Sequence, residues 1–470
     1  MNNFTATYTD QYQLAMAEVY FKQGRHREKA VFDYFFRDLP FSGGFAVFAG
    51  LEEVLEIIRD LHFSKEDLEY LSDQGFSDDF LKFLKDFRFR GTIYSCKEGD
   101  VVFPTRPILQ VEASIIEAQI IETLLLNILN YETLIATKAS RIRLVAGDGI
   151  LLDFGMRRAQ ATGAYFGSRA AMVGGFDGTS NVIAGRNYEI PVSGTMAHSF
   201  IQSYDDELKA FRDFAQGRPE GCVFLVDTYN TLKSGVPNAI KVAKEMEARG
   251  QKLLAIRLDS GDLAYLAKKS RQLLDDAGLE YVKIAASNQL DEYVIKSLLE
   301  QQAPIDIFGV GTNLITGDPD AALDGVYKLA WFNGKPRIKI SESIIKVTLP
   351  HKKQVFRIKD ASGKCVGADA IGLYHEDRID EMYHPFEPYK SMKLSEFRQE
   401  ALLNKVMENG KILQEHRSLS QIAEYSVSRL SELPIEYKRF NNPHIYKIGI
   451  SETLRQERDK LIHNYKQSLS

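Results

Sequence analysis

His198 lies in a segment of small and hydroxyl-bearing residues, Ser193-Gly-Thr-Met-Ala-His-Ser199. An imidazole can attack an electrophile or exchange a proton near neutral pH, although most histidines are surface or satisfied core residues. The small neighbours leave room for a phosphate or a substrate. Because acids, arginines and glycines follow several predicted strands in the same chain, we predict that His198 is catalytic.

Two aspartates follow predicted buried strands and could reach one common site. Asp227 and Asp259 are about 30 residues apart, the length of one strand-and-helix unit of a (β/α) barrel, and Asn288 follows after a similar interval. Carboxylates in such positions can bind ribose hydroxyls, hold Mg²⁺ or fix the tautomer of an imidazole. Asp262 stands where a helix should begin, so it is a candidate metal ligand and equally a candidate helix N-cap.

Arginines and glycines provide candidate anion-binding groups. The guanidinium groups of Arg157 and Arg158 match phosphate or carboxylate, although arginines at a strand end can also be simply exposed. Gly309 and Gly311 permit close approach of the backbone, and Thr312 adds a hydroxyl. This pattern suits a phosphomonoester at the usual late-strand phosphate position of a barrel. The residues alone therefore indicate an enzyme that handles a phosphosugar, without naming the acceptor.

The elements that must position these residues alternate between strand and helix from residue 150 onward. Apolar runs rich in Val, Ile and Leu predict buried parallel strands at 150–154, 222–227, 253–259, 282–287 and 305–309. Helices are predicted between them at 238–249, 262–277 and 290–300. Since no GxGxxG motif follows a strand, we predict an α/β fold with an irregular (β/α) barrel rather than a dinucleotide-binding fold.

The rest of the chain predicts a second domain of mixed α+β type. We expect helices at 8–23, 50–61, 114–146, 395–429 and 451–468, and strands at 30–37, within 91–112 and within 325–358, the last including 327–331 and 337–341. A hairpin is expected at 355–370. The predicted domains are 1–140, 141–325 and 326–470, with the C-terminal strands and helices completing the N-terminal domain.

The composition excludes several classes of protein. The net charge is −5 in 470 residues, whereas proteins that bind nucleic acid or anionic membranes are more often basic. Three widely separated cysteines predict neither a disulfide framework nor a metal cluster. The N-terminal sequence lacks the features of a signal peptide, and Glu117, Glu122 and Glu132 interrupt the most apolar stretch. We therefore expect a cytoplasmic protein with no nucleic-acid or membrane partner.

Several of these motifs together resemble the nicotinate phosphoribosyltransferase family, the type II phosphoribosyltransferases of NAD salvage. The similar segments run nearly from end to end, and they are 9–13, 153–159, 193–199, 227–229, 257–262 and 309–313. The resemblance implies transfer of phosphoribose from phosphoribosyl pyrophosphate to nicotinate, which gives nicotinate mononucleotide and pyrophosphate. It also implies coupled ATP hydrolysis through a phosphorylated histidine, with Mg²⁺ as cofactor.

The resemblance further implies roles for residues that match the family motifs. His198 would accept the phosphoryl group, Asp227 would orient its ring, and Asp259 would bind ribose hydroxyls or Mg²⁺, with Asp262 as a second metal contact. Nicotinate would contact Thr195 and Arg257. Phosphoribosyl pyrophosphate would contact Arg157, Asn288, Gly309, Gly311 and Thr312.

Two aromatic residues complete the implied acceptor site. Tyr12 and Phe154 would enclose the pyridine ring, with Tyr12 supplied by a second subunit of a homodimer. In relatives that use nicotinamide, an acid occupies the position of Ser180, where it would repel a carboxylate. Ser180 therefore favours nicotinate over nicotinamide. The alternatives are a nicotinamide phosphoribosyltransferase and a non-catalytic phosphosugar-binding barrel protein.

Overall fold

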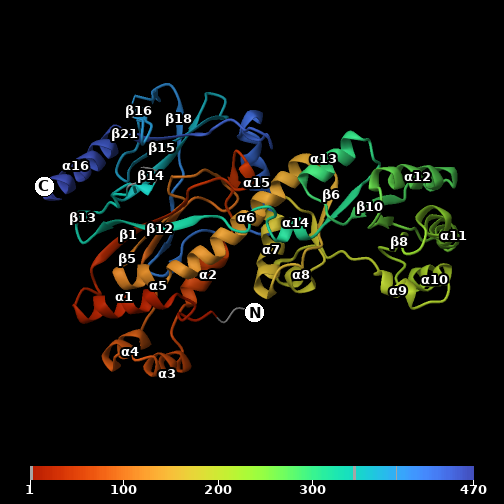
Figure 1. The fold of residues 1–470 in the computed structure, drawn as a ribbon, viewed down its shortest axis with the longest axis horizontal. Helices are drawn as coiled ribbons and strands as arrows, with labels where there is room; N and C mark the ends of the chain where they lie inside the picture. Colours follow the sequence, from red (N-terminus) through yellow and green to blue (C-terminus); the bar gives the residue numbers. More distant parts are fainter. Residues whose placement is uncertain (1–3, 342–345, 388, 470) are drawn as a thin grey trace. The chain divides into compact units, whose positions relative to one another are not determined.

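The computed structural model describes residues 4–341, 346–387 and 389–469. The chain divides into two compact units, Met1–Leu134 with Ala322–Ser470, and Ile135–Ala321. Figure 1 traces both, and each is described below by itself. Residues 342–345 of the predicted β-rich segment and the first three residues of the N-terminal stretch lie outside the described residues.

The first unit is built on a seven-stranded sheet that combines both ends of the chain. Its strand order is β13-β12-β1-β5-β3-β19-β20. The interior strand β1 (Lys29–Phe36) pairs in antiparallel fashion with β5 (Leu109–Ser114) on one side and with β12 (Gly325–Phe332) on the other (Figure 1). The prediction that C-terminal strands complete the N-terminal domain is therefore confirmed.

The other elements of this unit form two further sheets and the helices around them. A six-stranded sheet has the order β17-β16-β21-β15-β14-β18, and β2 pairs with β4. The remaining strands of the unit, those of the seven-stranded sheet included, are β2 (Ala46–Val47), β3 (Thr92–Ser95), β4 (Val101–Val102), β13 (Lys335–Pro336), β14 (Lys353–Lys359), β15 (Cys365–Leu373), β16 (Glu381–Tyr383), β17 (Ser391–Lys393), β18 (Arg398–Ala401), β19 (Asn404–Glu408), β20 (Lys411–Ile412) and β21 (Lys447–Ser451). The helices are α1 (Gln11–Lys22), α2 (Leu51–Asp60), α3 (Lys65–Asp73), α4 (Asp78–Lys85), α5 (Ile115–Ile120), α15 (Leu419–Glu432), α16 (Glu452–Leu469) and the first half of α6 (Glu122–Ala146), whose residues from Ile135 onward belong to the second unit.

The second unit is organised around a six-stranded parallel sheet with the order β7-β6-β11-β10-β9-β8. The strands are β6 (Ile150–Asp153), β7 (Gly178–Thr179), β8 (Val223–Leu225), β9 (Ala255–Leu258), β10 (Lys283–Ser287) and β11 (Ile307–Val310). The helices are α7 (Ala161–Val173), α8 (Val182–Tyr188), α9 (His198–Gln202), α10 (Glu207–Gly217), α11 (Val236–Glu247), α12 (Leu263–Asp276), α13 (Glu292–Glu300) and α14 (Thr312–Ile315), and a π-helical turn covers Thr231–Gly235. The sheet is barrel-like but does not close, so the predicted irregular (β/α) barrel is confirmed as an incomplete one.

Two predictions in the C-terminal part are wrong. The sequence predicts a single helix at 395–429. Residues 395–418 instead contain β18, β19 and β20, and the only helix in the predicted range is α15, which begins at Leu419. The helix-forming residues misled the prediction, because pairing of β18 with β14 and of β19 with β3 outweighs local propensity. The Asn409-Gly410 turn, with φ of 50° and 71°, is the hairpin signal that was missed.

The second wrong prediction is a strand at 337–341. The strand after the Asn333-Gly334 turn covers only Lys335 and Pro336. One further backbone hydrogen bond, from the Arg337 amide to the Ala330 carbonyl at 2.9 Å, follows it, and the same carbonyl also accepts from the His351 amide, which takes the place of a continued strand. The other predicted helices and strands are present, with ends shifted by a few residues. The three cysteines are free and buried, and no helix among the described residues combines the length and apolar character needed to cross a bilayer.

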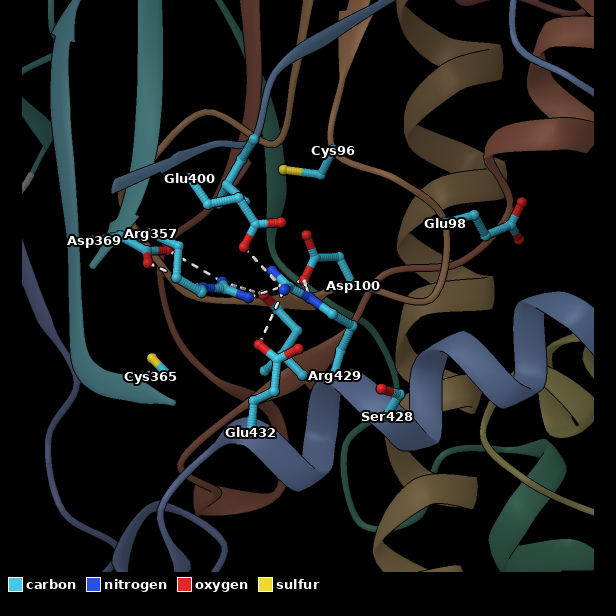
Figure 2. Close-up of polar contacts among 12 residues, drawn as sticks. Cys96, Glu98, Asp100, Arg357, Cys365, Asp369, Glu400, Ser428, Arg429 and Glu432 are labelled. Carbon is cyan, nitrogen blue, oxygen red and sulfur yellow. Dashed lines mark hydrogen bonds and ion pairs between the residues drawn. The ribbon is translucent and has the colours of Figure 1, made fainter. Parts of the chain in front are cut away.

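A buried network of charges joins distant segments of the first unit (Figure 2). Asp100, just before β4, accepts from Arg357 of β14 at 2.8 Å and from Arg429 of α15 at 3.0 Å. Arg357 also contacts Asp369 of β15 at 3.1 Å. Arg429 reaches two further carboxylates, those of Glu400 and Glu432. Burial alone would raise the pKa of Asp100, but the charges of Arg357 and Arg429 outweigh it and hold this pKa below its usual value.

Replacing Asp100 with Asn should destabilise the protein by about 3–5 kcal/mol at pH 7, since two buried guanidinium groups lose their shared carboxylate. A carboxyl group whose pKa is lowered by folding contributes stability above its unfolded pKa of about 3.9 and loses that contribution as the pH falls further. The difference between the two proteins should therefore shrink below about pH 4. Denaturant unfolding at several pH values measures this.

Asp79→Asn is the matched control. Asp79 pairs with Lys82 on the surface, where its side chain is 81% exposed, and the change should cost less than about 0.5 kcal/mol. Equal free energies of unfolding for the two variants at pH 7 would show that the Asp100 carboxylate does not stabilise the fold.

Candidate active site

All of the predicted site residues except Tyr12 lie in the second unit, and most of them stand at the carboxyl edge of its parallel sheet. Alternate side chains of a strand point to the same face, and one face carries a buried apolar cluster with a residue from each of five strands. These are Leu152, Val223, Ala255, Ala285 and Ile307. Two or four residues further along the same strands, at positions of the same parity, stand Phe154, Asp227, Arg257, Asp259, Ser287 and Gly309. The strand pleat therefore directs these residues to one side, above the apolar cluster.

His198 is brought to this edge by a segment that crosses the ends of the strands. Thr179 of β7 donates its amide to Pro191, and Ser193 returns a backbone hydrogen bond to Thr179, so the segment starts as an added strand beside β7. Thr195 then contacts Arg257 of β9, and His198 contacts Thr228, which follows β8. The segment thus spans from one edge of the open sheet to the other.

Arg257 is held by three partners from three parts of the chain. Its Nε donates to Ser287 Oγ at 2.8 Å, its Nη1 to Thr195 Oγ1 at 2.9 Å, and its Nη2 to Asp259 Oδ1 at 2.7 Å. Its guanidinium carbon lies 5.5 Å from the centroid of the Phe154 ring. Three fixed hydrogen bonds and an aromatic face leave this cation with one orientation.

The carboxylate of Asp259 is shared between Arg257 and Ser287. Burial alone would raise its pKa, but the Ser287 hydroxyl and the charge of Arg257 lower it below the usual value. Asp259 is therefore ionised at neutral pH. Its second oxygen, Oδ2, lies 3.9 Å from Nε2 of His198.

The imidazole of His198 has different neighbours at its two nitrogens. Nδ1 lies 3.1 Å from Thr228 Oγ1, while Nε2 lies 4.0 Å from Asp227 Oδ1. The side chain of His198 is 40% exposed, and that of Asp227 is 1% exposed. A half-exposed imidazole beside two carboxylates is suited to nucleophilic or proton-transfer chemistry on a ligand that arrives from solvent.

The Phe154 ring packs against β11 at Gly309, a position without a side chain. A Cβ atom at Gly309 would overlap the Phe154 ring, and one at Gly311 would lie 3.2 Å from its carbonyl oxygen. Asp153, which precedes Phe154, is buried and accepts hydrogen bonds from Gly155, Ser168 and Thr179. Burial is the main cause that raises the pKa of Asp153. These contacts fix the turn from which Phe154 projects.

Comparison with known proteins identifies the family. A family model described as "Nicotinate phosphoribosyltransferase (NAPRTase) family" matches residues 149–364, and models of its N-terminal and C-terminal domains match 7–130 and 352–458. The chain is 47% identical to nicotinate phosphoribosyltransferase of Bacillus subtilis over 98% of this chain and 95% of that protein. The chain belongs to the nicotinate phosphoribosyltransferase family.

Other relatives agree with this assignment. Nicotinate phosphoribosyltransferase of Dictyostelium discoideum is 38% identical over 97% of this chain and 88% of its own length. The crystal structure of human nicotinic acid phosphoribosyltransferase superposes with a TM-score of 0.86 and 30% identity, covering 96% of this chain and 99% of the human one. Nicotinate-nucleotide pyrophosphorylase of Pyrococcus furiosus gives a TM-score of 0.71 at 25% identity over 91% of this chain and 95% of its own. This member of the nicotinate phosphoribosyltransferase family therefore shares its fold with both solved structures.

The remaining predicted residues occupy more varied places. Ser180 follows β7 and donates its hydroxyl to the carbonyl of Asp153 at 3.2 Å. Arg157 is exposed. Asn288 follows β10 with a φ of 80°, and Thr312 begins the short helix α14. Tyr12, on α1 of the first unit, is 51% exposed.

Asp262 serves as a helix N-cap, the second of the two roles considered for it. Its Oδ1 accepts from the Tyr265 amide at the start of α12, at 3.0 Å. Within the described part of the chain, no group of three or more His, Cys, Asp or Glu side chains is arranged to hold a metal ion. Mg²⁺, however, commonly uses one or two carboxylates together with substrate phosphates and water. Asp259 has the oxygen chemistry for such a partial site.

Three hydroxyl residues of the site were missed by the sequence reasoning. Thr228 contacts His198, Ser287 bridges Arg257 and Asp259, and Ser260 donates to Asp227 Oδ2 at 2.6 Å. Ser287 has the parity of Ala285 and so faces the site, whereas the prediction named its neighbour Asn288. Counting alternate positions from the apolar cluster would have found Ser287. Thr228 and Ser260 lie in loops, where no such periodicity applies.

Gly309→Ala should displace the Phe154 ring and destabilise the protein by about 1–3 kcal/mol, the usual effect of overpacking. Denaturant unfolding followed by circular dichroism measures the change. Gly217→Ala is the control, because an added Cβ at Gly217 meets no atom within 4 Å. If both variants unfold at the same denaturant concentration, close packing of Phe154 on β11 is not a constraint.

Proposed function

We propose that this protein transfers phosphoribose from phosphoribosyl pyrophosphate to nicotinate, forming nicotinate mononucleotide and pyrophosphate for NAD biosynthesis. We propose further that ATP hydrolysis is coupled to the transfer through a phosphorylated His198. The observation that carries the proposal is the placement of His198, Asp227, Asp259 and Arg257 at one sheet edge of a chain in this family.

Arg257 is the proposed partner of the nicotinate carboxylate. A guanidinium has five N–H donors, and three are used by Ser287, Thr195 and Asp259. The two that remain are held in a fixed direction by those contacts, so an acceptor carboxylate would be bound without further ordering of the side chain.

Aromatic and hydroxyl groups would complete the acceptor site. The ring of Phe154, held against Gly309, offers a face for the pyridine, and Thr195 offers a hydroxyl beside Arg257. Ser180 carries no charge, so it would not repel a carboxylate as an aspartate would. Tyr12 is proposed to close the site from a second subunit, which would make the protein a homodimer with shared sites. Its large exposed area on α1, with Val19 58% exposed two turns further along the same helical face, supports an interface there.

The phosphosugar would be bound by groups at the ends of β6, β10 and β11. The exposed guanidinium of Arg157 can pair with a phosphate, and the backbone near Gly309 and Gly311 can approach one closely. Thr312 and Asn288 add polar side chains at the same edge. The ionised Asp259 can accept from ribose hydroxyls.

Mg²⁺ would be held by Asp259, with Asp262 as a second proposed contact through the oxygen that does not cap α12. When bound, the ion would neutralise part of the negative charge on the pyrophosphate. The residues of the chain orient the reactants: Arg257 and Phe154 hold the acceptor, and Asp259 holds the ribose. The acceptor nitrogen then attacks the anomeric carbon as the bond to pyrophosphate breaks, and positive charge that develops on the ribose lies near the Asp259 carboxylate.

His198 would accept the terminal phosphoryl group of ATP on a ring nitrogen, while ADP leaves with the electrons of the broken P–O bond. The carboxylates of Asp227 and Asp259, each within about 4 Å of Nε2, would stabilise the cationic ring that results. Hydrolysis of the phosphohistidine in each cycle would couple the two reactions.

His198→Ala should abolish ATP hydrolysis yet leave a slow transfer to nicotinate that does not depend on ATP. Product formation from nicotinate and from nicotinamide, each with and without Mg-ATP, measures both activities, together with release of ADP. His375→Ala, at an exposed histidine of the first unit, should behave as wild type. Retention of ATP hydrolysis in His198→Ala would refute the phosphohistidine, and turnover of nicotinamide instead of nicotinate would refute the proposed acceptor.

Arg257→Ala should raise the KM for nicotinate ~100-fold, equivalent to about 2.7 kcal/mol, if the guanidinium pairs with the carboxylate. The KM for nicotinamide, a neutral analogue, should change much less. Arg249→Ala, an exposed arginine of the same unit, is the control. An unchanged KM for nicotinate in Arg257→Ala would exclude this contact.

A further inference from the structure

The two nitrogens of the His198 ring face opposite chemical environments. On one side are oxygens of two aspartates, Asp259 Oδ2 at 3.9 Å and Asp227 Oδ1 at 4.0 Å from Nε2. On the other side is a single hydroxyl, that of Thr228, at 3.1 Å from Nδ1. A hydroxyl can donate or accept, whereas an ionised carboxylate can only accept.

Both carboxylates are held so that they cannot turn away from Nε2. Asp227 uses Oδ2 to accept from the Asp259 amide at 2.8 Å and from the Ser260 hydroxyl. Asp259 uses Oδ1 to accept from Arg257 and Ser287. Asp227 Oδ1 is buried and has no hydrogen-bond partner among the described residues. A proton on Nε2 would be attracted electrostatically to the two remaining oxygens, 3.9 and 4.0 Å away, whereas a lone pair there would be repelled by them.

From this asymmetry we infer that Thr228 is a positioning residue for His198, whose hydroxyl donates to the Nδ1 lone pair and holds the ring in the Nε2–H tautomer. The role within catalysis rests on the function proposed above, while the hydrogen bond itself does not. The tautomer places the lone pair, and hence the nucleophilic character of the neutral ring, at Nδ1. Rotation of the Thr228 side chain about its Cα–Cβ bond would move Oγ1 away and expose that lone pair without moving the backbone.

Thr228 suits this role better than a third acid would. A carboxylate at Nδ1 would compete with Asp227 and Asp259 for the single proton of the neutral ring and leave the tautomer undefined. The Thr228 hydroxyl as a donor beside Nδ1, with two acceptor carboxylates beside Nε2, specifies the Nε2–H tautomer. The arrangement resembles a catalytic triad in its logic, because an acid fixes the proton on the nitrogen that does not react.

The test compares Thr228→Val, which keeps the shape of the side chain and removes the hydroxyl, with Thr228→Ser, which keeps the hydroxyl. Loss of one hydrogen bond that orients the nucleophile should lower kcat for ATP hydrolysis ~10-fold in Thr228→Val, with KM for ATP changed less than ~2-fold. Thr228→Ser should recover most of the loss. Thr231→Val removes a hydroxyl from the same loop and should have no effect.

A spectroscopic measurement separates this inference from the proposed function. In protein labelled with ¹⁵N-histidine, the signals of His198, identified by their loss in His198→Gln, should show the Nε2–H tautomer in wild type and Thr228→Ser. In Thr228→Val the Nδ1 shift should move toward that of a lone pair without a hydrogen bond. If wild type shows this pattern but hydrolyses no ATP, the proposed function fails and the contact stands. An Nδ1–H tautomer in wild type, or identical ring signals and kcat in wild type and Thr228→Val, would overturn the inference.

Discussion

The ion pair between Arg257 and Asp259 is the contact on which the arrangement of the site depends. It joins residues at alternate positions of one strand, and each partner then engages a different element: Arg257 reaches Thr195 in the crossing segment, and Asp259 reaches toward His198 in the same segment. The positive charge of Arg257 and the negative charge of Asp259 thus offset one another above the apolar cluster. The fixed Asp259 carboxylate also lies beside the His198 ring. An acceptor that carries a carboxylate meets a cation already ordered by its own chain, and the ordering has been supplied by folding rather than by binding.

Charged groups serve two different purposes in this chain, depending on whether they are buried or partly accessible. In the first unit, Asp100, Arg357 and Asp369 lie almost wholly out of water and connect strands to α15, so their contribution is to a single arrangement of segments far apart in sequence. The second unit also buries an ion-pair cluster, Glu292 with Lys138 and Arg141, but Arg257, Asp259 and His198 of the candidate site stand at the rim of the sheet and remain partly accessible. Charges in the interior are costly unless all are paired, whereas those at the rim keep a capacity to bind a ligand.

Much of the fold could be predicted from the sequence, and the reasons are local. The apolar runs of β9, β10 and β11 and the glycines after their helices mark the parallel sheet, and the spacing of Asp227 and Asp259 places both at one edge. The strand β18 could not be predicted, because its residues favour a helix and only pairing with β14 makes it extended. The strand β19 pairs with β3, and its one local signal is the Asn409-Gly410 turn that follows it. The family resemblance implies that Asp227 orients the His198 ring, and Asp227 Oδ1 lies 4.0 Å from Nε2. The contact of Nδ1 with Thr228 at 3.1 Å could not be predicted, because Thr228 lies in a loop whose path follows no periodic pattern.

The segment that carries His198 also has a consequence for how this chemistry can change over time. The groups proposed to bind the acceptor and the phosphosugar belong mainly to the sheet, whereas the nucleophile belongs to a connection laid across it and attached by contacts at Thr179, Arg257 and Thr228. Connections tolerate replacement better than the strands on which they rest. An energy-coupling step can therefore be gained or lost by exchange of one segment, while the scaffold for transfer persists. The proposed coupling to a nucleotide would in this sense depend on the connection and not on the sheet itself.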